Sequence, residues 1–216
     1  MRKWLRTHTY SYALLYLVVY LVAFFLLEHS VQPRYIVHCF LDDWIPFCEI
    51  FIIPYLLWFP LLAGSLGFFL FKSKEDFQNL CMLMFTGMSI CLLCYAILPN
   101  GLQLREPLER DNLFCRIVAY LYQIDTPTNV CPSIHVSSTV AIHCVVKRSS
   151  LFKENRLVRM GSGVLAISII LATVCLKQHS VIDVILGCLL SYGLCYVTYH
   201  WNWRELLAQT KLRILL

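Results

Sequence analysis

The stretch Lys177-Gln178-His179-Ser180-Val181-Ile182-Asp183 lies between two long apolar runs near the end of the chain. Charged and titratable residues are costly at the edge of a bilayer, so this group of Lys, His and Asp calls for an explanation. If the second run is helical from about His179, then His179 and Asp183 lie on one helix face, four residues apart. The carboxylate would then hold an imidazole N–H and stabilise the imidazolium. The alternative interpretation is a hydrogen bond at the membrane edge with no catalytic role.

The composition indicates an integral membrane protein with a single domain over residues 1–216. Hydrophobic residues make up 59% of the chain and charged residues only 14%, and the mean hydropathy is +0.66. A soluble domain of this length needs far more charge to cover its surface. The net charge is +5, but the basic residues lie between apolar runs, and no nucleic-acid recognition motif accompanies them. The expected partner is therefore the bilayer and not a nucleic acid.

Six apolar runs predict an all-α fold with six transmembrane helices. The first run follows a basic start but is long and lacks a small-x-small cleavage site, so it is interpreted as a retained span rather than a signal peptide. The segment between the first two runs is predicted to be a short interfacial helix or a re-entrant segment. The runs cover approximately Tyr10–Leu27, Ile50–Phe71, Phe77–Leu98, Pro132–Val146, Met160–Leu176 and His179–Trp201.

The distribution of Lys and Arg predicts the orientation of these spans. Thirteen of them lie in the N-terminus, the second and fourth connections and the tail, and five lie in the other connections. The positive-inside rule then places both termini in the cytoplasm. With six spans, the long segment 99–131 and His179 lie on the same outer face. A multi-pass protein of the plasma membrane, with its active site at the outer membrane edge, is expected.

A second histidine, His135, opens the fourth run at the same predicted depth as His179. It follows Pro132 and Ser133, and proline with small hydroxyl residues is typical of a helix start. Free backbone N–H groups and the helix dipole at such a start suit a phosphate. One histidine can attack phosphorus while the other protonates the leaving oxygen. This chemistry needs no metal or other cofactor, and a zinc site is the less favoured alternative because only two His and one Asp converge.

These residues carry a resemblance to the type 2 phosphatidic acid phosphatase superfamily. Pro132-Ser133-Ile134-His135 resembles the family's Pro-Ser-Gly-His motif. His179-x-x-x-Asp183 resembles the end of its Ser-Arg-x5-His-x3-Asp motif. The resemblance covers about residues 98–187, with the two motifs in the family's order and on one predicted face. The two motifs together are a much more specific signal than either alone.

The resemblance implies a role for each of these residues. His179 would be the nucleophile that forms a phosphohistidine, and Asp183 would orient it. His135 would act as general acid for the leaving group and then as base for water. Ser133 and its neighbouring backbone amides would hold phosphate oxygens.

The chain departs from the family pattern in its cations. The family's Ser-Arg pair falls on Ala172-Thr173, and Ile134 replaces the family's Gly. In the family's first motif, Lys-x6-Arg-Pro, the Lys falls on Leu98, whereas the Arg is retained as Arg105. Lys177 is expected to supply the missing charge, so Arg105, Ser133 and Lys177 are the predicted phosphate-binding residues. These losses resemble the branch that includes the sphingomyelin-synthase-like phosphotransferases.

Three functions remain open at this point. The leading one is a metal-independent membrane phosphatase that hydrolyses a lipid phosphate or diphosphate monoester through a phosphohistidine. The second is a phosphotransferase that passes a phospho-headgroup to a lipid alcohol, because the acceptor is chosen by pocket shape and water exclusion. The third is a non-catalytic membrane protein, such as a transporter or scaffold, that retains the fold. The presence of His135, His179 and Asp183 favours the first two.

Overall fold

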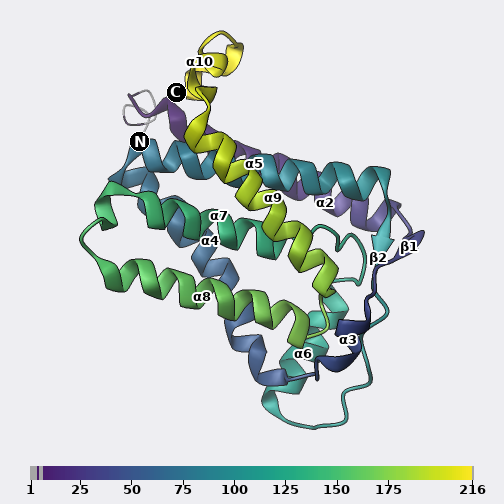
Figure 1. The fold of residues 1–216 in the computed structure, drawn as a ribbon. Helices are drawn as coiled ribbons and strands as arrows, with labels where there is room; N and C mark the ends of the chain where they lie inside the picture. The colour runs from purple at the N-terminus through teal and green to yellow at the C-terminus, as the bar shows by residue number, and fades with distance from the viewer. Residues whose placement is uncertain (1–3, 5–6, 216) are drawn as a thin grey trace.

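The structure of this chain is a computed structural model that describes residue 4 and residues 7–215. Within this part of the chain nearly all regular structure is helical, which confirms the all-α prediction (Figure 1). The long helices are α2 (Leu15–Ser30), α4 (Ile52–Lys72), α5 (Lys74–Ile97), α7 (Ile134–Arg148), α8 (Arg156–Cys175) and α9 (Val181–His200). The shorter ones are η1 (Thr9–Leu14), α3 (Phe40–Trp44), η2 (Glu49–Phe51), α6 (Leu113–Ile124), η3 (Ser150–Phe152), α10 (Trp203–Ala208) and η4 (Lys211–Leu215).

Five helical segments among the described residues are long and apolar enough to cross a membrane. They are Thr9–Ser30, Glu49–Lys72, Lys74–Ile97, Arg156–Cys175 and Val181–His200. On α2, Leu15, Val18 and Val19 are each more than 60% exposed. Apolar surface of this extent is not left in water, so a bilayer has to cover it. The chain thus has the character of a multi-pass membrane protein.

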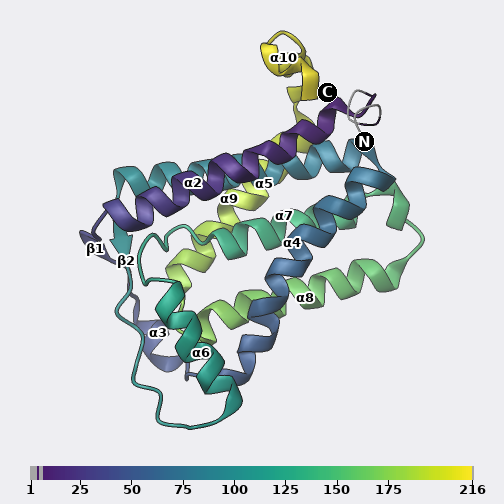
Figure 2. The same cartoon turned by 180° about the vertical axis from the view of Figure 1, so that it is seen from behind.

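Helix α7, at the predicted fourth span, is shorter than the other five and lies at the centre of the bundle. It has 15 residues, too few for a full crossing. It lies between α5 and α8, with α9 on one side (Figure 1) and α4 on the other (Figure 2). Its residues Val136, Thr139 and Val145 are fully buried. The other five predicted spans agree with observed helices to within a few residues at most boundaries. The predicted fourth span is also a helix, but its length is that of a helix in the core of a protein.

The connections divide between the two ends of the bundle. Both termini of the described chain, the α4–α5 turn and the α7–α8 loop lie at one end (Figures 1 and 2). The other end carries α3, α6 and the α8–α9 turn, which contains His179. This arrangement brings the predicted catalytic residues to the end away from the termini.

Three connecting segments meet at the end that carries α3 and α6, around Asn100. Strand β1 (Tyr35–Ile36) pairs in parallel with β2 (Asn100–Gly101), and Gly101 also bridges Thr128. The Asn100 amide accepts hydrogen bonds from the N–H groups of residues 130 and 131 and donates to two carbonyls. A Cβ at Gly101 would lie 2.8 Å from the Pro127 carbonyl oxygen, so glycine is required there. These bonds fix the loop that leads into α7.

Helix α6 was not predicted, because it lies within the long polar segment 99–131. Asn112 caps it by accepting a hydrogen bond from the Cys115 N–H. Its buried residues Cys115, Val118 and Leu121 recur every three residues on one face. Val118 and Leu121 belong to an apolar cluster with residues of α4 and α8. The helix contributes Leu121 and Ile124 to the lining of the cavity described below, so the connection 99–131 is structured rather than a simple loop.

Candidate active site

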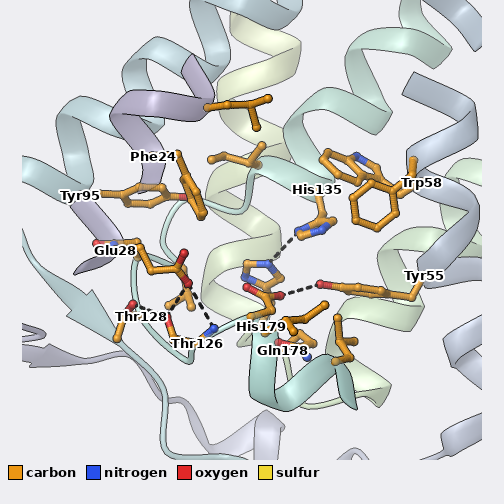
Figure 3. Close-up of a pocket in the computed structure, with 18 of the residues that line it drawn as sticks. Phe24, Glu28, Tyr55, Trp58, Tyr95, Thr126, Thr128, His135, Gln178 and His179 are labelled. Carbon is orange, nitrogen blue, oxygen red and sulfur yellow. Dashed lines mark hydrogen bonds between the residues drawn. The ribbon is translucent and has the colours of Figure 1, made fainter. Parts of the chain in front are cut away.

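His135 and His179 face each other at the end of the bundle that carries α3 and α6 (Figure 3), and Asp183 lies against His179. His135 is the second residue of α7, His179 lies in the α8–α9 turn, and Asp183 is the third residue of α9. His179 Nδ1 is 3.3 Å from Asp183 Oδ2, and His179 Nε2 is 3.4 Å from His135 Nδ1. His179 is 6% exposed and Asp183 is fully buried. Asp183, His179 and His135 thus form a row in which the carboxylate contacts one imidazole and that imidazole contacts the second.

The contact between His179 and Asp183 comes from the cap of α9 rather than from a shared helix face. Helix α9 begins at Val181, two residues after the predicted start. Ser180 is the N-cap, and its N–H donates to Asp183 Oδ2 at 2.9 Å in a capping box. The same oxygen faces His179 Nδ1. One carboxylate oxygen therefore both caps the helix and orients the imidazole.

The turn before α9 directs His179 toward α7. Lys177 has φ 53°, in the left-handed region, and this conformation ends α8. The N–H groups of Gln178 and His179 both donate to the Thr173 carbonyl oxygen at 3.0 Å. The chain reverses within a few residues, and His179 lies between its own helix start and His135.

Helix α9 lies directly against the start of α7 because residue 187 is glycine. A Cβ at Gly187 would lie 2.9 Å from the Ser133 carbonyl oxygen and 3.1 Å from Val136 Cβ. A side chain there would push the two helices apart, since the interior is already close-packed. The separation of His179 from His135 depends on this contact.

If this site hydrolyses a lipid phosphate, as the sequence predicts, Gly187→Ala should reduce the rate of hydrolysis about 10²-fold, because misplacing reacting groups by an ångström has about that effect. The overpacked contact should also lower stability by about 1–3 kcal/mol. Gly193→Ala on the same helix is the matched control, because nothing lies within 4 Å of a Cβ there. Initial rates and thermal unfolding of both variants check this expectation. Equal activity in the two variants would show that the α7–α9 contact does not set the geometry.

Asp42 of α3 holds the start of α9 from the other side, and its role was missed at the sequence level. It is 2% exposed, and its carboxylate accepts from Ser180 Oγ at 2.6 Å, the Val181 N–H at 2.8 Å and the Cys39 N–H at 2.8 Å. The feature of the sequence that could have indicated this role is an Asp close to a predicted membrane edge, because a carboxylate that is removed from water needs hydrogen-bond donors. Asp42 is a positioning residue for the His179–Asp183 pair.

The charge of Asp42 should make stability depend on pH. Burial alone raises the pKa of Asp42, but hydrogen bonds from Ser180, Val181 and Cys39 outweigh it and hold the pKa below its ordinary value. The carboxylate therefore stabilises the folded state above its unfolded pKa of about 3.9, and this contribution is lost as pH falls through the folded pKa. We expect Asp42→Asn to lower the Tm at neutral pH, and its difference from wild type to shrink below about pH 4.

Thermal unfolding across this pH range checks the expectation. Asp43→Asn is the matched control, because the neighbouring Asp43 side chain is 62% exposed and contacts only the exposed His38. A Tm difference for Asp42→Asn that stays constant down to about pH 3 would contradict a role for the charge.

A cavity of about 280 Å³ lies beside the two imidazoles, and both His135 and His179 line it (Figure 3). Its aromatic lining consists of Tyr20, Phe24, Tyr55, Trp58, Phe59 and Tyr95. Its polar lining, besides the two histidines, consists of Glu28, Asp125, Thr126, Thr128, Asn129 and Gln178. The cavity lies between the two histidines and the helices α2 and α4.

The charged groups that line this cavity are carboxylates. Glu28 accepts from Thr126 Oγ1 at 2.7 Å, and Asp125 accepts from the Tyr55 hydroxyl at 3.1 Å. Burial raises the pKa of Asp125 above its ordinary value. None of the lining residues is Lys or Arg. Such a lining suits a cationic group beside the histidines, because carboxylates and aromatic faces both attract cations.

Two amide groups with free donors also line the cavity. Gln178 Nε2 and Asn129 Nδ2 are buried and have no hydrogen-bond partner among the described residues. Gln178 Oε1 accepts from the Arg105 guanidinium at 2.6 Å. Because a guanidinium can only donate, this bond fixes the amide orientation and leaves Nε2 as the free donor. Buried unpaired donors are costly, so these two are candidates to bind substrate oxygens.

The three predicted phosphate-binding residues lie behind the cavity wall and do not line it. Lys177 Nζ donates to the carbonyl oxygens of Asp42 and Ile45 at 2.7 and 2.6 Å, which ties α3 to the α8–α9 turn. Ser133 is the buried N-cap of α7 and accepts from the Val136 N–H. Arg105 donates to Gln178 and to the carbonyl oxygens of Tyr122 and Asp125.

These positions correct the roles expected from the sequence. The resemblance assigned Arg105 and Ser133 to the phosphate, and Lys177 was expected to replace a missing family cation, but the side chains of all three are turned to other partners. Lys177 and Ser133 support the backbone of the site, and Arg105 reaches the cavity only through Gln178. The cavity is lined instead by Gln178, which carried no sequence signal of its own, and by Asn129, for which helix capping was the alternative, and both have unpaired amide donors.

The site contains His, Asp and amide groups, and no cluster of three or more His, Cys, Asp or Glu among the described residues is arranged to hold a metal ion. Comparison of the chain with protein-family models, curated proteins and solved structures finds no match. The functional interpretation therefore rests on the two motifs and on the geometry of this site.

Proposed function

We propose that this protein is a membrane enzyme that cleaves the P–O ester bond of a lipid phosphate through a phosphohistidine on His179. The observation that carries the proposal is the row Asp183–His179–His135 beside a cavity. A nucleophile, a group that orients it and a second acid–base residue within hydrogen-bonding reach form the arrangement that covalent catalysis requires. Membership of the type 2 phosphatidic acid phosphatase superfamily is part of the same proposal.

The first chemical step breaks the bond between phosphorus and the lipid oxygen. His179 Nδ1–H donates to Asp183, which leaves the Nε2 lone pair free to attack phosphorus. The lipid alkoxide leaves and takes a proton from His135. A phosphoryl group does not fit between nitrogens 3.4 Å apart, so the His135 ring has to turn aside as substrate enters.

The second step returns the enzyme to its starting state. His135, now neutral, removes a proton from water as the water oxygen attacks the phosphohistidine. The P–N bond breaks, inorganic phosphate leaves, and the electron pair returns to His179 Nε2. Gln178 Nε2 and Asn129 Nδ2 hold the phosphate oxygens during both steps, since hydrogen bonds to charged oxygens are among the strong ones.

The walls of the cavity favour a lipid over a water-soluble phosphate. Leu21 of α2 and Phe59 of α4 line the cavity, and they are themselves 62% and 53% exposed. The cavity thus reaches the apolar surface of the bundle, which the bilayer covers. A lipid can enter from the membrane with its phosphate toward His179 and its chains against α2 and α4.

The carboxylates favour a second candidate, transfer of a zwitterionic phospho-headgroup to a lipid alcohol. Glu28 and Asp125 line the cavity together with six aromatic rings, and this combination binds an ammonium group. The phosphohistidine would then be attacked by a lipid hydroxyl instead of water, with His135 removing the hydroxyl proton. Neutral amide donors suit the single negative charge of a phosphodiester better than the double charge of a monoester.

Six spans with both termini in the cytoplasm and the site at the outer face of the plasma membrane belong to the same proposal. The arrangement of the connections supports it, because the basic α4–α5 turn and α7–α8 loop lie at the end of the bundle that carries the termini. Helix α7 is too short to cross a full bilayer on its own, but it runs from the end that carries His135 to the end that carries the α7–α8 loop. Counted as the sixth crossing, it gives an even number of crossings, which agrees with both termini on one side.

The effect of replacing His135, the proposed general acid, should depend on the leaving group of the substrate. We expect His135→Ala to reduce turnover of a lipid phosphate by about 10²–10³-fold, because an alkoxide leaves poorly without a proton. With an aryl phosphate, whose phenol leaving group is acidic, the rate of the first step should fall far less in this variant. Burst kinetics with the two substrates measure this difference. An equal loss with both leaving groups would assign His135 a role other than proton donation.

The proposed activity is tested by incubating purified protein with radiolabelled lipid phosphates, without added metal. The panel contains phosphatidic acid, phosphatidylglycerol phosphate, undecaprenyl diphosphate and headgroup-labelled phosphatidylcholine, the last with ceramide as the acceptor alcohol. Release of free phosphate supports hydrolysis, and label in a second lipid supports transfer. No turnover of any lipid, together with specific binding of a protein or solute, would contradict both and favour a non-catalytic protein.

A further inference from the structure

A second cavity, shallow and lined by both basic and apolar side chains, lies at the end of the bundle away from His179, between the end of α7 and the start of α8. Its volume is about 450 Å³. His143 and Lys147 line it from α7, and Arg156 and Arg159 line it from α8. No acidic residue lines it. The cavity therefore concentrates positive charge, unlike the cavity beside the histidines.

The cations of this cavity have no ionic partner in the described part of the chain. Lys147, Arg156 and Arg159 form no ion pair there, although Arg110 and Arg116 each pair with a carboxylate. Arg159 Nε is buried and has no hydrogen-bond partner among the described residues. A buried cationic N–H without an acceptor is unfavourable, and an anion in the cavity would supply one.

His143 closes the inner side of the cavity. Its Nδ1 lies 2.9 Å from Ser162 Oγ, so the imidazole joins α7 to α8. A Cβ at Gly163 would lie 3.2 Å from His143 Cε1, and glycine admits the ring at this depth. The shallow cavity thus has a fixed inner wall at His143 and a partly buried cation at Arg159, with Lys147 and Arg156 exposed at its rim.

An apolar face continues from the basic end along α8. Met160, Val164 and Ile167 also line the cavity, and they are 55%, 64% and 61% exposed. They recur at helical spacing on one face of α8 and lead away from the loop toward the middle of the bundle. A ligand that fills both parts has an anionic head and an apolar chain.

We propose that this cavity binds the headgroup of an anionic phospholipid, with one acyl chain lying along α8. Arg156, Arg159 and Lys147 bind the phosphate, and Met160, Val164 and Ile167 contact the chain. Basic pockets between transmembrane helices bind anionic headgroups in this way. The site is separate from the catalytic cavity and does not depend on the reaction proposed for it.

Native mass spectrometry of the full chain with phosphatidylglycerol and with phosphatidylcholine tests the proposal. Wild type is expected to retain phosphatidylglycerol in preference to phosphatidylcholine. Arg156→Gln combined with Arg159→Gln should weaken phosphatidylglycerol binding about 30-fold, because each cation contributes about one kcal/mol to the attraction. Equal retention of the two lipids by wild type would overturn the proposal.

Two controls separate a specific site from general surface charge. Lys153→Gln removes a cation from the same loop, but this residue does not line the cavity, so binding should be unchanged. An equal loss of phosphatidylglycerol binding in Lys153→Gln would show that the lipid is attracted to the loop as a whole. That result would contradict a specific site in the cavity. Binding of soluble glycerol phosphate as tightly as of the lipid would contradict the role of the α8 face. Unchanged thermal unfolding in phosphatidylcholine nanodiscs confirms that the double variant is folded.

Discussion

His179→Ala is expected to lower the turnover of lipid phosphate by a factor on the order of 10⁴ or more, because the variant has no nucleophile to form the covalent intermediate. His179 Nε2 is the nitrogen that faces His135, and its other nitrogen faces Asp183. An alanine leaves the Ser180–Asp183 cap in place, so the fold should persist. Initial rates with the best substrate of the lipid panel measure the effect.

His200→Ala is the matched control for this substitution. His200 is the last residue of α9, its Nδ1 contacts the Tyr196 carbonyl oxygen, and its ring stacks on Tyr196. Removal of this imidazole should leave the rate unchanged. Substantial turnover by His179→Ala would contradict its assignment as the nucleophile, and an equal loss in His200→Ala would indicate a general effect on the protein.

Asp183→Asn is expected to lower kcat by about 10⁴-fold, as a neutral amide does in place of the carboxylate of a Ser-His-Asp triad. An asparagine oxygen can still accept the Ser180 N–H, so the cap of α9 is retained. The amide oxygen in this position still faces His179 Nδ1, but the amide carries no charge to stabilise the imidazolium. The loss should therefore appear in kcat, with little change in Tm.

Comparison with Asp183→Ala separates the two roles of this residue. Alanine removes both the cap and the charge, so it should lower stability by about 1 kcal/mol or more as well as activity. If Asp183→Asn keeps full activity while Asp183→Ala loses it, then Asp183 acts only as a helix cap. That result would leave His179 without the orienting group that the mechanism requires.

The fold class and most of the helices could be predicted because they follow from local apolar pattern. Runs such as Ile50–Phe71 are long enough to be recognised by length alone, and the structure places α4 and its neighbours there. The pair His179 and Asp183 was found by its spacing of four residues. The expected cause was a shared helix face, whereas the observed cause is the cap at Ser180.

The residues that complete the site depend on contacts between distant segments, so the sequence does not reveal them. Asp42 reaches Ser180 across 138 positions of the chain, and Arg105 reaches Gln178 across 73. The role expected of Lys177 came from its position next to His179. In the structure the left-handed backbone at Lys177 sends the side chain to α3 instead.

The most direct test of the central claim is to trap the phosphorylated enzyme. Purified protein is mixed with a lipid whose phosphoryl group carries a radiolabel, quenched in alkali within the first turnover and digested. We predict an acid-labile, alkali-stable label on the peptide that contains His179, and its absence in His179→Ala. Full turnover with no label on His179 at any quench time, or label on another residue, would contradict a phosphohistidine at this position.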